Sequence, residues 1–322
     1  MKEFLVLGGA VLPIFAIVAA GLLLRRLNWL TEDADHSLLR VCINLFVPAL
    51  IFASILGNEA LRDLNNLLIP PIVGFGAATA GIGIGWIVSR WSGAANRDQR
   101  ASFALAAGLQ NYVYYALPII ALLFNQATVG VLFLHNVGVD AVLWTVGVAV
   151  LSGSSWRASW RGLLNAPIIS LLCAVTVNLV EPRAGWLRAL ISPGGVFLTA
   201  SHVLGQCAIP IGLLLTGAVV ADHLPDIRRG PSARMISMAL LVRFLAAPLL
   251  YLTLARLLPC SLELKRTLAV QGTMPSAMFP VLMTRRYGGD SCIAVQIVVA
   301  TTIASLVMAP IWIRIAAWFI PM

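Results

Sequence analysis

Apolar residues are arranged along this chain in ten long segments, which short polar stretches separate. Most segments approach or exceed the ~20 residues that a helix needs to cross the ~30 Å hydrocarbon core of a bilayer. They lack the ~10-residue alternating pattern that is typical of strands in a membrane barrel. The pattern therefore predicts an all-α polytopic membrane protein with ten transmembrane helices. The expected spans are residues 4–24, 38–57, 66–89, 101–124, 128–152, 163–180, 196–221, 235–258, 267–284 and 291–319.

A proline-centred pattern occurs twice, once in each half of the chain. Pro48 and Pro118 are 70 residues apart, and Pro210 and Pro280 are also 70 residues apart. Interrupted apolar segments at matching positions of two halves are typical of secondary transporters. Because each half holds an odd number of spans, the second half is expected to be inverted relative to the first. The resulting units are a first five-helix repeat, a cytoplasmic linker and a second, inverted five-helix repeat, at residues 1–152, 153–162 and 163–322.

The composition agrees with a chain that has lipid as its solvent. Hydrophobic residues make up 60% of the 322 residues, charged residues make up 11%, and the mean hydropathy is +0.91. An average soluble domain carries about 25% charged residues. The net charge of +9 does not indicate a nucleic-acid partner, because the basic residues lie mostly in short loops. They are more frequent in the loops after odd-numbered spans, which predicts that both termini lie on the periplasmic or extracellular side.

Hydrogen-bonding residues stand seven positions before one proline of each pair, Asn111 before Pro118 and Thr273 before Pro280. A proline inside a helix removes a backbone hydrogen bond and clashes with the preceding turn. Spans four and nine are therefore expected to be kinked or unwound. Unwound backbone survives at membrane depth only where it is buried in protein or lines a wet cavity. We expect a solvated, substrate-sized cavity where spans four and nine meet.

Several short motifs follow one another in a fixed order along nearly the whole chain. They are Asn44-x-x-x-Pro48-Ala49-Leu50-Ile51-Phe52, the Asn111 to Pro118 interval, Asn165-Ala166-Pro167-Ile168-Ile169, Val242-Arg243 followed by Pro248, and Met274-Pro275-x-x-x-x-Pro280 followed by Arg285-Arg286-Tyr287-Gly288. In these motifs the chain resembles the auxin efflux carrier family, as a bacterial relative of the plant PIN-formed carriers. The resemblance implies a scaffold domain and a transport domain in which broken spans four and nine cross. One departure is Gln110, which stands where the PIN-formed carriers have a proline before the crossing asparagine.

Polar and kinked positions near the predicted breaks are the candidates for contact with a substrate. They are Gln110, Asn111, Tyr114, Thr273, Pro275 and Ser276 at spans four and nine, with Asn44 and Gln206 in spans two and seven. The helix breaks themselves are assigned to Pro48, Pro118, Pro210 and Pro280.

Ionisable residues inside the spans are costly in lipid and are candidates for function by default. Asp140 and His135 lie in span five, and Arg243 lies in span eight. Asp140 or His135 is a candidate for coupling proton movement to substrate movement. A structural alternative for Asp140 is an ion pair with Arg243, and a structural role is favoured for Arg243 and for His135.

No motif of an enzyme or of a nucleotide-driven pump is present. Glu32, Asp33, Asp35 and His36 form a cluster that we expect in a solvated loop. The five cysteines form no C-x-x-C pair, so they indicate neither a metal site nor a disulfide. We expect no enzyme activity, no metal and no cofactor. A ladder of glycines in span three, with Gly81 and Gly85 as a G-x-x-x-G, predicts close helix packing within the protomer or at a homodimer contact.

The favoured function is a secondary transporter in a bacterial inner membrane that moves a small organic anion by alternating access. The family resemblance implies a dicarboxylate or an auxin-like acid, and predicted helix N-termini near the breaks favour an anion. Uniport, proton coupling and sodium coupling all stay open. The alternatives are a sodium-coupled organic-anion symporter like the bile-acid carriers and a transporter-like sensor that moves nothing.

Overall fold

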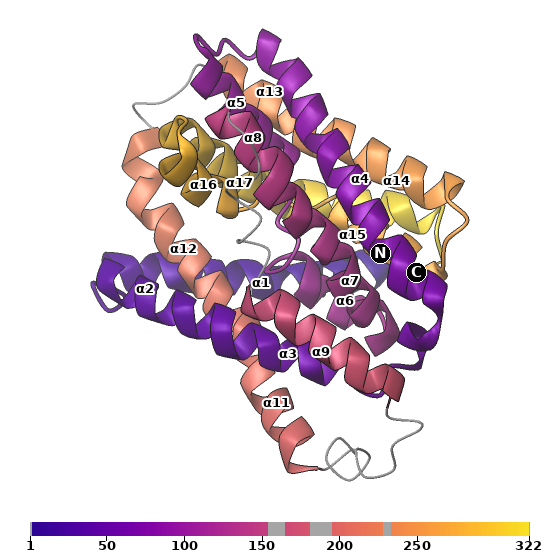
Figure 1. Ribbon diagram of the computed structural model, residues 1–322. Coiled ribbons are helices and arrows are strands. Elements are labelled where there is room, and N and C mark those ends of the chain that lie inside the picture. The colour runs from indigo at the N-terminus through magenta and orange to yellow at the C-terminus, as the bar shows by residue number, and fades with distance from the viewer. Residues whose placement is uncertain (1, 154–164, 181–194, 228–232, 322) are drawn as a thin grey trace.

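The computed structural model describes residues 2–153, 165–180, 195–227 and 233–321, and every regular element in these residues is a helix (Figure 1). Among the described residues, six helices are long and apolar enough to cross a membrane. They are Glu32–Ile55, Leu64–Trp91, Gln126–Ser152, Val196–Asp222, Ala233–Leu257 and Ser291–Ala317. The chain is therefore a multi-pass membrane protein whose described residues form helices as their regular structure. Of the expected linker, residues 154–162 lie outside the described residues.

The helices follow the predicted apolar segments, but several segments hold more than one helix. In chain order the α-helices are α1 (Lys2–Arg26), α2 (Glu32–Val41), α3 (Val47–Ile55), α4 (Leu64–Val88), α5 (Arg97–Gly108), α6 (Ala116–Leu123), α7 (Gln126–Val142), α8 (Val148–Ser152), α9 (Ala166–Val180), α11 (Val196–Gln206), α12 (Ala208–Ile227), α13 (Ala233–Leu241), α14 (Ala247–Leu257), α15 (Leu262–Gln271), α16 (Phe279–Tyr287) and α17 (Ser291–Ala317). Short 3₁₀-helices are η2 (Glu59–Arg62) and η3 (Ser89–Trp91), and π-turns are η1 (Cys42–Phe46), η4 (Leu143–Gly147) and η8 (Val242–Ala246).

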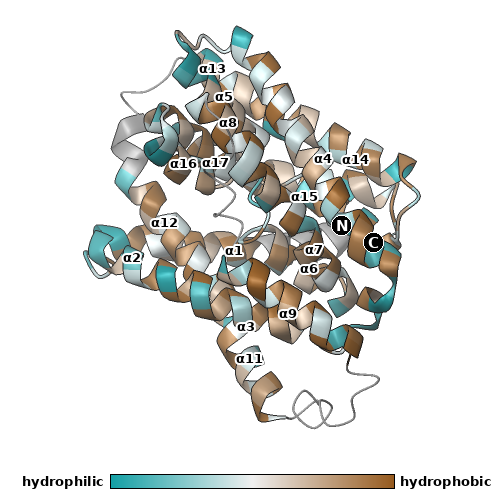
Figure 2. Ribbon diagram, viewed as in Figure 1, coloured by the Kyte–Doolittle hydropathy of each residue, from teal (hydrophilic) through white to brown (hydrophobic). Residues whose placement is uncertain are grey.

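Hydrophilic residues gather at helix ends, whereas the helix middles are mostly apolar (Figure 2). The start of α2 is one such end. The expectation of a loop around His36 is wrong, because His36 lies in α2. Thr31 caps this helix by accepting a hydrogen bond from the Ala34 N–H, and Glu32, Asp33 and Asp35 occupy its first turn. Acidic residues stabilise a helix N-terminus because they oppose its positive dipole end.

The helices form two packed groups. In the first bundle, α1 packs against α12, and α3 packs against α9 and α11. In the second bundle, α4 packs against α5 and α7, α17 packs against α5 and α13, and α15 packs against α7 and α14. The first bundle fills the lower part of Figure 1 and most of the second lies above it. The chain enters the first bundle again after α8, so each bundle contains segments from both halves of the sequence.

Each predicted break proline lies in the first turn of a helix, but only Pro118 and Pro280 follow residues that are not helical. Pro48 is the second residue of α3, after the π-turn η1, and Pro210 is the third residue of α12, after a turn at Cys207. Pro118 is the third residue of α6 and Pro280 is the second residue of α16. The first turn of a helix tolerates proline because its N–H groups have no partner within the helix. Pro118 and Pro280 therefore begin the second part of spans four and nine, after unwound residues. Pro48 and Pro210 do not break their spans, because Glu32–Ile55 and Val196–Asp222 each continue as one helix through η1 and through the turn at Cys207.

Candidate functional site

Spans four and nine are each interrupted in the middle. Helix α5 ends at Gly108 and α6 begins at Ala116, while α15 ends at Gln271 and α16 begins at Phe279. The residues between them are extended or form turns, and several of them carry polar side chains. Thr273 is one of these, and its hydroxyl donates to the Val270 carbonyl at 2.8 Å. Such local side-chain bonds compete with helical ones and favour the interruption.

The two interruptions pair with each other through their backbones. The Asn111 N–H donates to the Pro275 carbonyl at 2.7 Å, and the Ala277 N–H donates to the Leu109 carbonyl at 3.0 Å. The pairing forms an isolated antiparallel β-bridge. It satisfies backbone groups that would otherwise be unpaired inside the protein. Spans four and nine therefore meet at their breaks, as residues 109–111 and 275–277.

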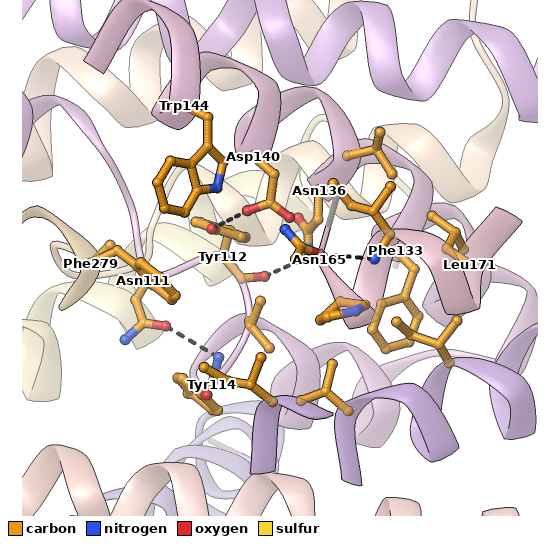
Figure 3. Close-up of a pocket in the computed structure, with 18 of the residues that line it drawn as sticks. Asn111, Tyr112, Tyr114, Phe133, Asn136, Asp140, Trp144, Asn165, Leu171 and Phe279 are labelled. Carbon is orange, nitrogen blue, oxygen red and sulfur yellow. Dashed lines mark hydrogen bonds between the residues drawn. The ribbon is translucent and has the colours of Figure 1, made fainter. Parts of the chain in front are cut away.

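Neighbouring residues of the bridge point to opposite sides, as they do in any extended strand. Gln110 is fully buried, and its amide nitrogen donates to the Tyr251 hydroxyl at 2.5 Å. Asn111 points the other way, and its side-chain oxygen accepts a 3.2 Å bond from the Tyr114 N–H (Figure 3). Ser276, the bridge partner of Gln110, is also buried, with its N–H bonded to the Thr301 hydroxyl at 3.1 Å.

A cavity of about 230 Å³ lies beside the crossing, between the two bundles. The crossing contributes one wall, α7 and η4 contribute a second, and the first bundle contributes the third through α3, α9 and their neighbouring residues. The polar or aromatic side chains that line it are Asn111, Tyr112, Tyr114, Phe133, Asn136, Asp140, Trp144, Asn165 and Phe279 (Figure 3). No Lys, Arg or His belongs to the lining that the described residues form.

Asp140 is the carboxylate of this cavity, and it is held by the crossing. The Tyr112 hydroxyl donates to Oδ1 of Asp140 at 2.5 Å. The Tyr112 carbonyl in turn accepts hydrogen bonds from Asn136 at 3.0 Å and from Gln271 at 3.2 Å. Gln271 also donates to Oδ1 of Asn136 at 3.0 Å, so span five, span nine and the break in span four share one hydrogen-bond network.

The structural alternative for Asp140, an ion pair with Arg243, is not formed in the structure. Within the described residues, the ion pairs of the structure join Arg25 to Asp35 and to Asp222, and none involves Asp140. Arg243 is fully buried, and its Nη1 donates to the Gly108 carbonyl at 3.3 Å. Asp140 lines the cavity, whereas Arg243 lies near Tyr251, on the side of the crossing to which Gln110 points. Asp140 and Arg243 are therefore on opposite sides of the crossing.

Most of the other candidate residues lie outside the cavity lining. His135 is fully buried, with Nδ1 at 3.4 Å from Oδ1 of Asn136. Asn44 and Gln206 are exposed and use their amides locally, toward the Arg40 carbonyl at 2.8 Å and the His202 Nδ1 at 3.1 Å. Gln110, Thr273, Pro275 and Ser276 are in the crossing itself. Of the eight substrate-contact candidates, only Asn111 and Tyr114 line the cavity.

Several lining residues were not among the substrate-contact candidates that the sequence suggested. Tyr112 adjoins Asn111, and Asn136 shares a helix face with Asp140, so both had a detectable local signal. Trp144 lies on the π-turn η4, and Asn165 comes just before α9. Nothing in their local sequence connects Trp144 and Asn165 to span four. The described residues hold no group of three or more His, Cys, Asp or Glu side chains that could bind a metal ion.

A family model described as "Membrane transport protein" matches residues 6–157 and 155–313, one match on each half of the chain. The chain belongs to this family. The match confirms the resemblance to the auxin efflux carriers that the motifs indicated. A protein of Methanothermobacter thermautotrophicus described as an "Uncharacterized transporter" is 24% identical over 312 residues, which cover 94% of this chain and 96% of that protein. One cavity of this membrane transport protein thus lies where the two matched halves meet at their breaks.

Proposed function

We propose that this membrane transport protein is a secondary transporter that moves a small organic anion, such as a dicarboxylate or an auxin-like acid, by alternating access. The observation that carries the proposal is the cavity between the two bundles at the crossing. Both bundles contribute to its lining, so a relative movement of the bundles would change which side of the membrane it faces. Substrate sites at broken helices near the middle of the membrane are typical of secondary transporters.

The charge of the substrate is inferred from the helix ends at the cavity. Helix α16 begins at Phe279, and Ala277, Met278 and Phe279 all line the cavity. A helix N-terminus carries about half a positive charge, which favours an anion. Besides Asp140, the Asn111, Asn136 and Asn165 amides and the Tyr114 side chain add polar groups to a lining that also holds aromatic and aliphatic side chains. A small acid with an apolar body fits this combination.

Asp140 opposes an anion in the same cavity unless it carries a proton. Its Oδ1 accepts the Tyr112 hydrogen bond, and no basic residue of the described lining offsets its charge. We infer that Asp140 is protonated when the anion binds, so that one proton accompanies the substrate. His135 is a poorer candidate for this role because it does not line the cavity.

The proposal includes a membrane topology. Ten spans would form two inverted five-helix repeats, residues 1–152 and 163–322, with both termini on the periplasmic side of a bacterial inner membrane. The two family matches, one on each half, support a repeat. A homodimer stays a prediction. The glycine ladder of span three supports packing within the chain, because Gly81 and Gly85 approach the backbone of α5.

The direct test is flux into proteoliposomes that contain the purified protein. Radiolabelled malonate, malate and an aromatic acid would be offered at several pH values, with protein-free liposomes as the control. The proposal predicts saturable uptake of at least one acid, with more uptake at acidic pH. Saturable binding of an acid without any flux would indicate a sensor instead and would contradict the proposal.

A further inference from the structure

Arg243 is a fully buried cation without an acidic partner. It lies in the π-turn η8 of span eight and has no solvent-exposed surface. No carboxylate pairs with it in the part of the chain that the structure describes. Its Nη1 donates to the Gly108 carbonyl, while Nε and Nη2 have no hydrogen-bond partner. A buried charge is costly unless another group balances it, so some feature of the fold must offset this one.

The balancing group is the end of a helix. Gly108 is the last residue of α5, where span four stops for the crossing. The C-terminus of a helix carries about half a negative charge and carbonyl groups that lack helical partners. In an uninterrupted span this end would lie at the membrane surface, near water. Here it lies inside the protein, and the Arg243 guanidinium is the cation that meets it.

Arg243 lies against the crossing, on the side that faces away from the cavity. Tyr251 is close enough to Arg243 for an electrostatic interaction, and its hydroxyl accepts the hydrogen bond from Gln110. Gly272, just after the end of α15, packs on the same tyrosine, since a Cβ at Gly272 would lie 2.6 Å from the Tyr251 Cβ. Arg243 and Tyr251 therefore connect span eight to the break in span four, and Tyr251 extends the contact to the break in span nine.

We propose that Arg243 is a built-in cation for the crossing, which does the work that a bound sodium ion would otherwise do. Helix C-termini and free carbonyls within a membrane protein attract cations. A sodium ion at such a place would make stability and transport depend on sodium, whereas a covalently attached guanidinium makes both independent of it. Arginine suits this position because it keeps its charge when buried, which lysine does less reliably. Arg243 is a positioning residue here, because it acts through α5 and does not line the cavity.

Thermal unfolding of the purified full-length protein tests the proposal without any substrate. The wild type would be melted in sodium chloride and in N-methylglucamine chloride of equal ionic strength. Arg243→Met would be melted with and without low millimolar guanidinium, which is able to replace the lost group. Arg256→Met is the matched control, because Arg256 lies on the same span in α14 but is exposed.

The proposal predicts equal melting temperatures of the wild type in the two salts. It predicts a lower melting temperature for Arg243→Met, a loss that guanidinium largely restores, and no guanidinium response in Arg256→Met. A wild type that sodium stabilises, or a folded Arg243→Met that melts like the wild type or ignores guanidinium, would overturn it. If Arg243→Met can be purified only with guanidinium present, the proposal is supported, whereas failure to recover the variant even with guanidinium would overturn it.

A transport measurement adds a second, separate readout. This part rests on the proposed transport function, and it predicts that uptake of a transported acid is unchanged when sodium is replaced by N-methylglucamine. Uptake that requires sodium would overturn the inference while leaving the transport function intact. If no acid is transported at all, the transport proposal fails, and the melting experiment still decides the role of Arg243.

Discussion

The Asn111 N–H donates a 2.7 Å hydrogen bond to the Pro275 carbonyl, and this bond joins residues that are far apart in the sequence but lie at matching breaks. Pro275 has no N–H of its own to contribute, but its carbonyl is free to accept because the helix has ended at Gln271. The bond fixes which side chains of the break face the cavity. Asn111 therefore has two roles, since its backbone closes the crossing and its side chain lines the cavity.

Gln271 is expected to be important for the stability of the crossing. Its amide nitrogen donates to the Tyr112 carbonyl and to Asn136, and its side chain is fully buried. Gln271→Leu removes both bonds and leaves buried acceptors with fewer partners, at a cost of about 1–3 kcal/mol. A lower melting temperature of the purified variant would show this. Gln206→Leu, at an exposed position of α11, should melt like the wild type.

Two glycines of α4 give a matched test of helix packing. A Cβ at Gly81 would lie 2.5 Å from the Gly108 carbonyl oxygen, whereas nothing lies within 4 Å of a Cβ at Gly83. Gly81→Ala would push α4 away from the end of α5 and should destabilise the protein by about 1–3 kcal/mol. Gly83→Ala should be neutral or stabilise it by up to about 1 kcal/mol, because alanine is the better helix former. Equal melting temperatures for the two variants would argue against the described contact of α4 and α5.

The protonation state of Asp140 is expected to set the pH dependence of uptake. If an anion enters only when Asp140 is protonated, uptake falls as pH rises and the carboxylate ionises. Asp140→Asn keeps the neutral shape of the protonated acid, so uptake by this variant should lose most of its pH dependence. Asp63→Asn is a suitable control because Asp63 is an exposed cap of α4, and asparagine also caps helices. A wild-type pH profile in Asp140→Asn would exclude Asp140 as the proton site.

The apolar helices and the two interruptions at the crossing were predictable from the sequence, because lipid forces spans to be apolar and Pro118 and Pro280 mark where helices restart. Pro48 and Pro210 look similar in the sequence, but their helices continue. The identity of the lining residues was less predictable. Gln110 and Asn111 are adjacent and chemically similar, and only the backbone pairing with Pro275 sends one away from the cavity and the other toward it. The partner of Asp140 was also missed, since Tyr112 reaches it from a different span. Contacts of this kind depend on how the spans pack, which local sequence does not encode.

The central claim is that the substrate binds in the cavity beside the crossing, and Asn111 tests it most directly. The Michaelis constant for an acid that the wild type transports would be measured for Asn111→Ala and for Asn44→Ala in proteoliposomes. Loss of one amide contact of about 1–2 kcal/mol predicts roughly a tenfold higher Michaelis constant in Asn111→Ala. Asn44→Ala should stay within about twofold of the wild type, because Asn44 is exposed and outside the cavity. An unchanged Michaelis constant in a folded Asn111→Ala, or an equal rise in Asn44→Ala, would contradict the claim.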